Sequence, residues 1–179
     1  MSQLQGQCNE LIIDLCQSNV TELEIFQNAY KNFALCQNIK LMNYKIDLEQ
    51  ITGNWQSIVC INCNICQTNP NTVFISIQHF KVVNSQINLD YLKAACKKLE
   101  LVQSKVQCNM NNVMIIEELI LKETDINTPL NIQHIEANSS KLIIGTETNS
   151  LKVTNCDVQF KLNYKYDFLS KILWSPSQL

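Results

Sequence analysis

The chain has 179 residues, of which 46% are hydrophobic and 17% are charged. A chain of this length can form one domain that buries roughly two-thirds of its unfolded surface. The formal net charge is −2, and all 14 basic residues are lysine. These values exclude a basic surface for a nucleic-acid backbone, and they exclude an arginine finger or a bidentate arginine–phosphate contact from this chain.

The cysteines and the apolar residues indicate the compartment. Nine cysteines are an odd number, and several of them stand at apolar repeat positions. We therefore expect reduced thiols in the cytoplasm rather than a disulfide framework. The first six residues carry no basic side chain, and no apolar run approaches the ~18 residues of a membrane span. The sequence thus predicts a soluble cytoplasmic protein that has no signal peptide and contacts no membrane.

Residues 1–38 are predicted to form an N-terminal helical cap. Thr21 and Glu24 have the spacing of a capping box, in which a hydroxyl and a carboxylate satisfy the first backbone N–H groups of a helix. Four apolar side chains then recur at helical spacing: Leu23, Phe26, Tyr30 and Phe33. An earlier apolar cluster at residues 11–15 fits either a short helix or an edge strand. A cap is expected because a stack of repeats otherwise exposes its core at the open end.

An eight-residue pattern recurs between residues 39 and 162. Its clearest copies are Ile58–Ile65 (IVCINCNI) and Leu151–Val158 (LKVTNCDV). The first, third and eighth positions are apolar in nearly every copy, and the fifth position is polar. The seven copies begin at Ile39, Ile58, Ile75, Leu99, Leu119, Ile135 and Leu151. Their fifth residues are Asn43, Asn62, His79, Gln103, Glu123, Ser139 and Asn155.

This pattern predicts two short strands joined by a tight corner. Apolar residues two apart indicate a strand with one face turned inward, and the polar fifth residue marks the corner. The eighth residue opens a second strand, as in Val158–Leu162. We therefore predict a mainly β protein, a right-handed parallel β-solenoid of about seven short coils with helical caps. The corner amides should stack as ladders and replace glycine, of which the chain has only 3.

Two segments interrupt or end the repeats. Asn88–Lys98 is predicted to be a short helix inserted on one coil, with Asn88 as its N-cap. Gln67–Asn71 is predicted to be a turn. Residues 163–179 are predicted to form a C-terminal cap with a closing helix over Phe168–Leu173, or a segment exchanged with a partner. Residues 1–179 are expected to form a single domain, in which residues 39–162 carry the repeats.

The pattern apolar-x-apolar-x-Asn-Cys in Ile58–Cys63 and Leu151–Cys156 resembles the coils of the CARP-type β-helix. That fold forms the C-terminal domain of cyclase-associated proteins and the domain of tubulin-binding cofactor C, and the resemblance covers roughly residues 39–162. It implies a module that binds actin or tubulin, a cytoskeletal or ciliary location, and a homodimer. The cofactor C branch resembles a GTPase-activating protein with an arginine finger, which a chain without arginine cannot supply.

An α/β leucine-rich-repeat solenoid is the alternative fold. The eight-residue pattern also resembles the core LxLxxNxL, and a helix before Leu99 would suit the convex side of such a horseshoe. The steps of about 16 residues between Leu119, Ile135 and Leu151 are shorter than these repeats need. This fold would imply an adaptor subunit of a larger complex.

Cys60, Cys63 and Cys66 form a CxxCxxC motif, which could hold a soft metal ion. It suggests a small metal-binding module as a further alternative function. The repeat gives a simpler explanation, because Cys60 stands at the inward third position and Cys63 at the sixth. The motif therefore favours core thiols, and no fourth ligand stands nearby in the sequence.

The sequence predicts no catalytic, cofactor-binding or metal-binding residue. His79 and His134, the only histidines, belong to no catalytic pattern and are expected at a corner or on the surface. Glu117 and Glu118 are adjacent in a strand and should point to opposite faces. The aromatic residues of the C-terminal segment could pack in the cap or anchor a partner: Tyr164, Tyr166, Phe168 and Trp174. The sequence thus predicts a non-enzymatic protein-interaction or scaffold module.

Overall fold

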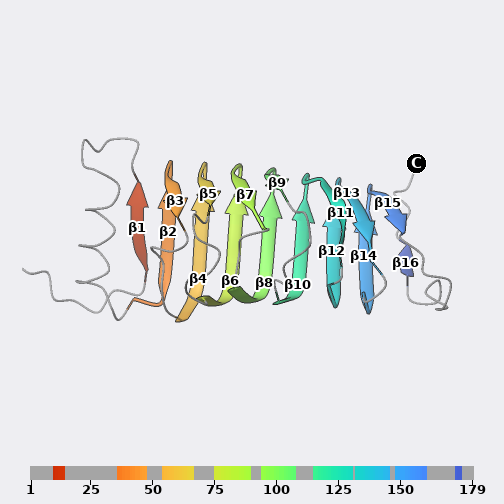
Figure 1. The fold of residues 1–179 in the computed structure, drawn as a ribbon, viewed down its shortest axis with the longest axis horizontal. Coiled ribbons are helices and arrows are strands. Elements are labelled where there is room, and N and C mark those ends of the chain that lie inside the picture. Colours follow the sequence, from red (N-terminus) through yellow and green to blue (C-terminus); the bar gives the residue numbers. More distant parts are fainter. Residues whose placement is uncertain are drawn as a thin grey trace, which may run out of the picture.

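The computed structural model describes residues 10–14, 36–47, 54–66, 75–89, 94–107, 115–130, 132–145, 148–160 and 172–174. All strand pairs in this part of the chain are parallel. Within each sheet, neighbouring strands come from successive coils, so the chain winds as a β-solenoid (Figure 1). The predicted fold class is confirmed.

The strands form one long sheet and two short ones. The long sheet has nine strands: β1 (Leu11–Asp14), β2 (Asn38–Met42), β4 (Asn54–Ile61), β6 (Ile75–Val83), β8 (Ala94–Val102), β10 (Ile115–Lys122), β12 (His134–Asn138), β14 (Ser150–Thr154) and β16 (Ile172–Trp174). A four-stranded sheet contains β3 (Lys45–Asp47), β5 (Asn64–Cys66), β7 (Gln86–Asn88) and β9 (Lys105–Gln107). A three-stranded sheet contains β11 (Ile126–Leu130), β13 (Lys141–Ile144) and β15 (Asp157–Phe160).

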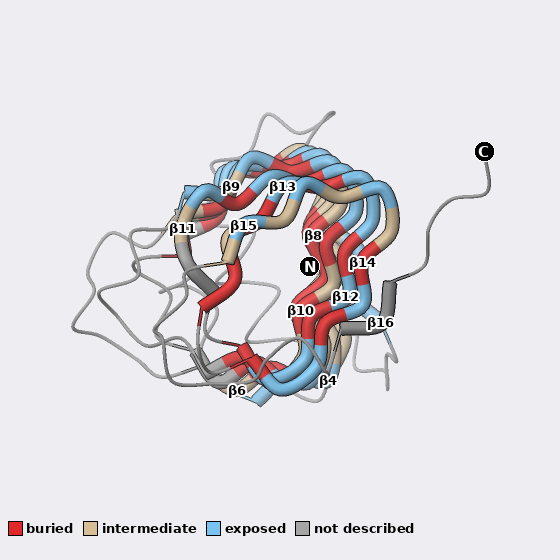
Figure 2. Tube along the Cα trace, turned by 90° about the vertical axis from the view of Figure 1, so that its right-hand side faces the viewer, coloured by how far each residue is buried: buried red, intermediate tan, exposed pale blue. Residues whose placement is uncertain are grey.

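The core lies inside the coils, where the apolar repeat positions meet. Ile58 and Cys60 are 0% exposed, and so are Phe80 and Val82 in the next coil. Seen along the stack in Figure 2, buried residues face the interior and exposed residues the outside, and successive coils nearly superpose. Burying each large apolar side chain contributes about 1.5–3 kcal/mol. A one-residue slip would turn this whole set outward, so the pattern fixes the register.

The predicted frame is confirmed in six coils and wrong in the third. The registered first positions are Ile39, Ile58, Phe80, Leu99, Leu119, Ile135 and Leu151, so the third copy begins at Phe80 rather than Ile75. Its corner is Asn84–Ser85, and His79 lies within β6 instead of at a corner. The error arises because β6 is long and alternates apolar residues on both sides of Phe80.

The predicted helix over Asn88–Lys98 is wrong where the structure describes it. Asn88 ends β7, and residues 94–98 begin β8, which pairs with β6 on one side and β10 on the other. The stretch Ala94–Lys98 has good helix formers, but two neighbouring strands saturate its backbone groups and override this preference.

The two predicted caps contain strands where they are described. Within residues 1–38, Leu11–Asp14 form β1, so the edge-strand interpretation of this cluster is correct. In the C-terminal segment, Ile172–Trp174 form β16, and the predicted closing helix is wrong for them because they pair with β14. The capping box at Thr21–Glu24 and the turn at Gln67–Asn71 lie outside the described residues.

No helix occurs among the described residues, and this part of the chain therefore does not show a leucine-rich-repeat horseshoe. The same residues contain no helix of the length and apolarity that a membrane crossing requires.

Candidate interaction surface

Each corner is built by one residue in the left-handed backbone region. Asn43, Asn62 and Asn84 have φ values of 58°, 54° and 46°, and Gln103, Glu123, Ser139 and Asn155 lie between 48° and 53°. Asparagine tolerates this region better than most residues because its short amide can bond locally. The corner N–H donates to the next coil, as from Asn62 to the Val83 carbonyl at 3.1 Å.

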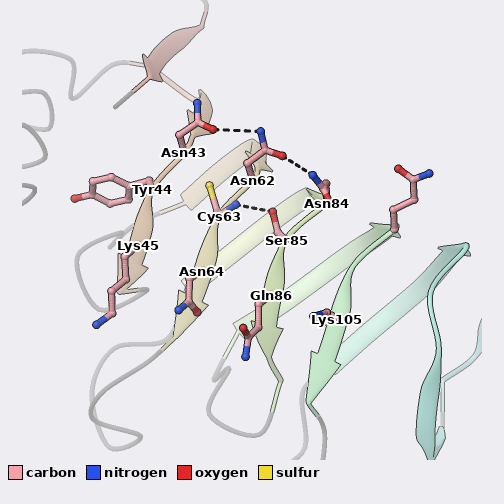
Figure 3. A pocket seen from close by; sticks show the side chains of 11 residues that line it. Asn43, Tyr44, Lys45, Asn62, Cys63, Asn64, Asn84, Ser85, Gln86 and Lys105 are labelled. Atoms are coloured by element: carbon pink, nitrogen blue, oxygen red, sulfur yellow. Dashed lines mark hydrogen bonds between the residues drawn. The ribbon is translucent and has the colours of Figure 1, made fainter. Parts of the chain in front are cut away.

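The corner amides stack as a ladder, as the sequence predicts. Asn84 Nδ2 donates to Asn62 Oδ1 at 2.8 Å, Asn62 Nδ2 to Asn43 Oδ1 at 3.2 Å, and Asn43 Nδ2 to Asp14 Oδ1 at 2.8 Å. Figure 3 shows the stacked asparagines. A separate rung joins Gln103 Nε2 to Glu123 Oε2 at 2.8 Å. This ladder ties the coils together along the outside of the corner.

A second ladder runs inside the corner, through the sixth repeat position. Ser85 Oγ accepts from the Cys63 N–H at 2.8 Å, and Ser104 Oγ accepts from the Ser85 N–H at 3.3 Å. Thr124 and Ser140 continue this series. Each hydroxyl also donates to the carbonyl two residues earlier, as Ser104 does to Val102 at 2.8 Å. The thiols of Cys63 and Cys156 likewise donate to the carbonyl two residues earlier, both at 3.2 Å.

Beside the corners lies an open groove of about 820 Å³. Its lining is polar and includes the amides of Asn62 and Asn84 and the ammonium groups of Lys45 and Lys105 (Figure 3). No acidic side chain is among its lining residues. Most of the amides that line it already bond to one another or belong to exposed strand positions.

The outer face of the long sheet carries three rows of side chains, one from each outward strand position. We call them the entry row, the middle row and the corner row. The entry row contains Asn38, Ser57, His79, Lys98, Glu118, His134 and Ser150. The middle row contains Ile12, Lys40, Val59, Lys81, Glu100, Ile120, Glu136 and Lys152. The corner row contains Asp14, Met42, Ile61, Val83, Val102, Lys122, Asn138 and Thr154.

An ion-pair network crosses the middle of this face. Glu100 lies 2.9 Å from Lys122 Nζ, 3.2 Å from Lys81 Nζ and 3.6 Å from His79 Nε2, and it is only 7% exposed. Burial alone would raise the pKa of Glu100, but hydrogen bonds and charges from Lys122 and Lys81 outweigh it and hold the pKa below the ordinary 4.5. Lys98 and Glu118 form a further pair at 3.3 Å.

The corner row is apolar over four adjacent strands. Met42, Ile61, Val83 and Val102 stand side by side on β2, β4, β6 and β8, and each is partly exposed. Val59 lies beside them in the middle row and is also partly exposed. A continuous apolar strip rimmed by charges is typical of a surface that binds another protein. We therefore take the outer face of the long sheet as the candidate site.

Two of the three CxxCxxC thiols are buried in the coil. Cys60 is 0% exposed and Cys63 4% exposed. Burial and a hydrogen bond with Cys63 raise the pKa of Cys60 well above its usual 9.0. The same bond and backbone hydrogen bonds lower the pKa of Cys63 to about 7, against the effect of burial. Among the residues that the structure describes, no three His, Cys, Asp or Glu side chains are placed to hold a metal.

Of the other residues considered in the sequence, Glu118 and His134 are register partners on β10 and β12. Exposed His134 shares a hydrogen bond of 2.8 Å with Ser150 Oγ. Glu117 is exposed, and Glu118 Oε1 accepts a hydrogen bond from Lys98 Nζ at 3.3 Å. Tyr164, Tyr166 and Phe168 lie outside the described residues. The sequence interpretation missed Glu100 and the lysines that pair with it. The signal that could have found them is the outward position of Lys81. That position follows only from the correct frame of the third coil.

The chain is a parallel β-solenoid whose long sheet carries a partly exposed apolar strip on its outer face. No protein-family model, curated protein or solved structure matches the chain.

Proposed function

We propose that this protein is a non-enzymatic interaction module that binds a partner protein through the outer face of its long sheet. The observation that carries the proposal is the apolar strip Met42, Ile61, Val83 and Val102, flanked by the charges of Lys81 and Glu100. Solvent-exposed strand positions are normally polar, and an apolar strip across four strands is a cost without a partner. Charges beside it would set the orientation of that partner.

For the class of partner, we propose a cytoskeletal subunit, actin or tubulin, and a cytoplasmic, cytoskeletal or ciliary location. The support is the resemblance of Ile58–Cys63 and Leu151–Cys156 to CARP-type coils. The stacked parallel coils agree with that resemblance in architecture.

The test is a binding assay with a surface variant. Ile61→Thr/Val83→Thr makes the strip polar and keeps β-branched side chains, so the strands should remain intact. Tagged wild type and variant would be used to capture proteins from extract, and purified actin and tubulin would be assayed directly. We expect the variant to weaken capture at least about tenfold, since two apolar contacts are lost.

The matched control is Asn64→Thr/Gln86→Thr, which changes two exposed residues on β5 and β7, away from the long sheet. This control should capture the same proteins as the wild type. A wild type that captures nothing more than the strip variant would refute the proposed function. Failure of purified actin and tubulin to bind would refute only the cytoskeletal partner.

A further inference from the structure

The second coil differs from the others at the inward positions of its corner. The third repeat position is aliphatic in the other six coils, where it holds Leu41, Val82, Leu101, Leu121, Ala137 and Val153. In the second coil the third residue is Cys60, and the sixth residue is Cys63. Among the described coils, the second is therefore the one that places a thiol at both inward positions.

The two thiols lie against each other inside the corner. They share a hydrogen bond, and Cys60 is 0% exposed and Cys63 4% exposed. Two residues, Ile61 and Asn62, separate them in the chain, and Asn62 turns the backbone at a φ of 54°. Two cysteines whose sulfur atoms already meet can form a disulfide without a large movement of the backbone.

One of the two thiols is reached from solvent. Cys63 is among the residues that line the open groove beside the corners, and Cys60 is not (Figure 3). The hydrogen bond from Cys60 is the largest of the effects that lower the pKa of Cys63 to about 7, so a large part of this thiol is ionised near neutral pH. A thiolate with solvent access and a second thiol behind it is typical of redox-sensitive cysteine pairs.

We propose that Cys60 and Cys63 form a redox-sensitive pair, which hydrogen peroxide converts to a disulfide and a small thiol such as glutathione restores. The proposal gives the first two cysteines of the CxxCxxC motif a chemistry other than metal binding. It concerns the two thiols alone and does not depend on the proposed binding of a partner protein.

The oxidation takes place in two steps. In the first, the Cys63 thiolate attacks one oxygen of the peroxide, so that an S–O bond forms, the O–O bond breaks and hydroxide leaves. In the second, the Cys60 sulfur attacks the sulfur of the Cys63 sulfenic acid. An S–S bond forms, the S–O bond breaks, and the oxygen leaves as water with the proton of Cys60. The hydroxide takes up the proton that Cys63 released on ionisation, so two thiols are oxidised and one peroxide is reduced to two waters.

The seventh coil provides a reference within the same chain. Cys156 occupies the same sixth position as Cys63, and its thiol donates to the carbonyl two residues earlier at the same distance of 3.2 Å. Cys156 is also more exposed than Cys63. Its neighbour at the third position is Val153, which carries no thiol. We therefore expect peroxide to produce no disulfide between the third and sixth positions of this coil.

Two substitutions test the pair, and each copies the residues of another coil. Cys60→Val gives the second coil the arrangement of Val153 and Cys156. Cys63→Ser gives it a hydroxyl at the sixth position, as in Ser85 and Ser104. Both variants should therefore fold, and circular dichroism checks that they do. Cys66→Ser, which changes the third cysteine of the motif, is the matched control.

The measurement is mass spectrometry of the full chain after treatment with hydrogen peroxide, alkylation of the remaining thiols and proteolysis. In the wild type and in Cys66→Ser we expect a bond between Cys60 and Cys63 that dithiothreitol reverses. In Cys60→Val, Cys63 should stop at the sulfenic acid, which dimedone traps. In Cys63→Ser the buried Cys60 should stay reduced, because it has no access to solvent of its own.

A wild type in which peroxide produces no bond between Cys60 and Cys63 would overturn the proposal. A bond from Cys63 to Cys66 in its place would overturn it as well. These measurements contain no partner protein, so they come out the same way if the apolar strip captures nothing, and the two proposals can fail separately.

Discussion

At the scale of single residues, Glu100 shows how an outward carboxylate can become buried. Its neighbours Lys81 and Lys122 stand on the adjacent strands β6 and β10 and fold over it, which leaves 7% of the residue exposed. A buried carboxylate is unfavourable unless charged donors surround it. Here the ammonium groups of Lys122 and Lys81 do so, and the net effect is a pKa below the ordinary 4.5.

This lowered pKa predicts a pH-dependent contribution to stability. The unfolded chain takes up the Glu100 proton near pH 4.5, before the folded chain does, so the contribution is full at neutral pH and is lost as the pH falls below 4.5 towards the folded-state pKa. We expect Glu100→Gln to lower the free energy of unfolding by about 1–2 kcal/mol at pH 7, from the loss of charged hydrogen bonds.

Urea unfolding of wild type and Glu100→Gln between pH 3 and pH 7 measures this contribution. The difference between the two proteins should shrink as the pH falls below 4.5. A difference that stays constant, or grows, over this range would show that the lysines do not stabilise the ionised carboxylate. Glu136→Gln is the control. The exposed carboxylate of Glu136 pairs with Lys152 at 3.1 Å, so its loss should have little effect on the free energy of unfolding.

At the scale of the elements, the corner is the part that joins two strands and also joins the coils. Its residue must adopt a positive φ, and its amide must reach the amides of both neighbours. Asn62 does both, because it donates to Asn43 and accepts from Asn84. The two demands together explain why asparagine replaces glycine at these positions.

Two substitutions separate these demands. Asn62→Gly keeps the backbone conformation and loses only exposed ladder bonds, so we expect it to cost about 1 kcal/mol or less. Asn62→Val loses the same bonds and adds the strain of a β-branched residue at positive φ, for a total of about 2–3 kcal/mol. Urea unfolding followed by circular dichroism would compare them, with Asn64→Val on the exposed side of β5 as a control. Equal stability of the two Asn62 variants would contradict a left-handed corner.

The corners are also the part of the fold that the sequence predicts best. The pattern around Asn62 and Asn155 contains both the apolar alternation and the amide, so strand, corner and register follow from it together. In β6 the alternation extends to both sides of Phe80, and apolar residues alone then fit two frames. The predicted helix at Ala94–Lys98 fails for another reason, since the strands that pair with it are about 20 residues away in the sequence and local preference does not record them.

The candidate surface was harder to predict than the fold. With the third copy started at Ile75, Lys81 takes the seventh position and does not line up with Lys40, Glu100 or Glu136. A five-residue error in one coil therefore hides a row that crosses the whole sheet. The apolar strip is hidden for the same reason, because Val83 joins Ile61 and Val102 only in the correct frame.

At the scale of the whole molecule, the contacts of each coil are chiefly with the coils before and after it, as in other repeat proteins. Phe80 and Leu99 are equivalent, so residues 80–98 make up one complete coil. The rows on the outer face depend on the number of coils, whereas the fold of each coil does not. Stability and surface pattern should therefore respond differently to the removal of a coil.

Deletion of residues 80–98 tests this. It joins His79 to Leu99 in register, and we expect a folded β protein whose urea m-value falls by about a tenth, in proportion to the lost surface. It also removes Lys81 and Val83 from the outer face, so the capture of a partner protein through this face should weaken. Deletion of residues 80–95 joins His79 to Cys96 out of register and should not fold. Circular dichroism and capture from extract would compare the two, and a folded out-of-register deletion would contradict the nearest-neighbour stack.

The inner ladder has a consequence for the ageing of the protein. Asparagine deamidates when the backbone nitrogen of the next residue attacks the side-chain amide and closes a succinimide ring. After Asn62 and Asn84, the nitrogens in question belong to Cys63 and Ser85, and their N–H groups donate to Ser85 Oγ at 2.8 Å and Ser104 Oγ at 3.3 Å. Both asparagine amides are also held by their neighbours in the outer ladder. The folded solenoid should therefore protect its corner asparagines from spontaneous conversion to aspartate, and their chemical lifetime should shorten sharply once the coils come apart.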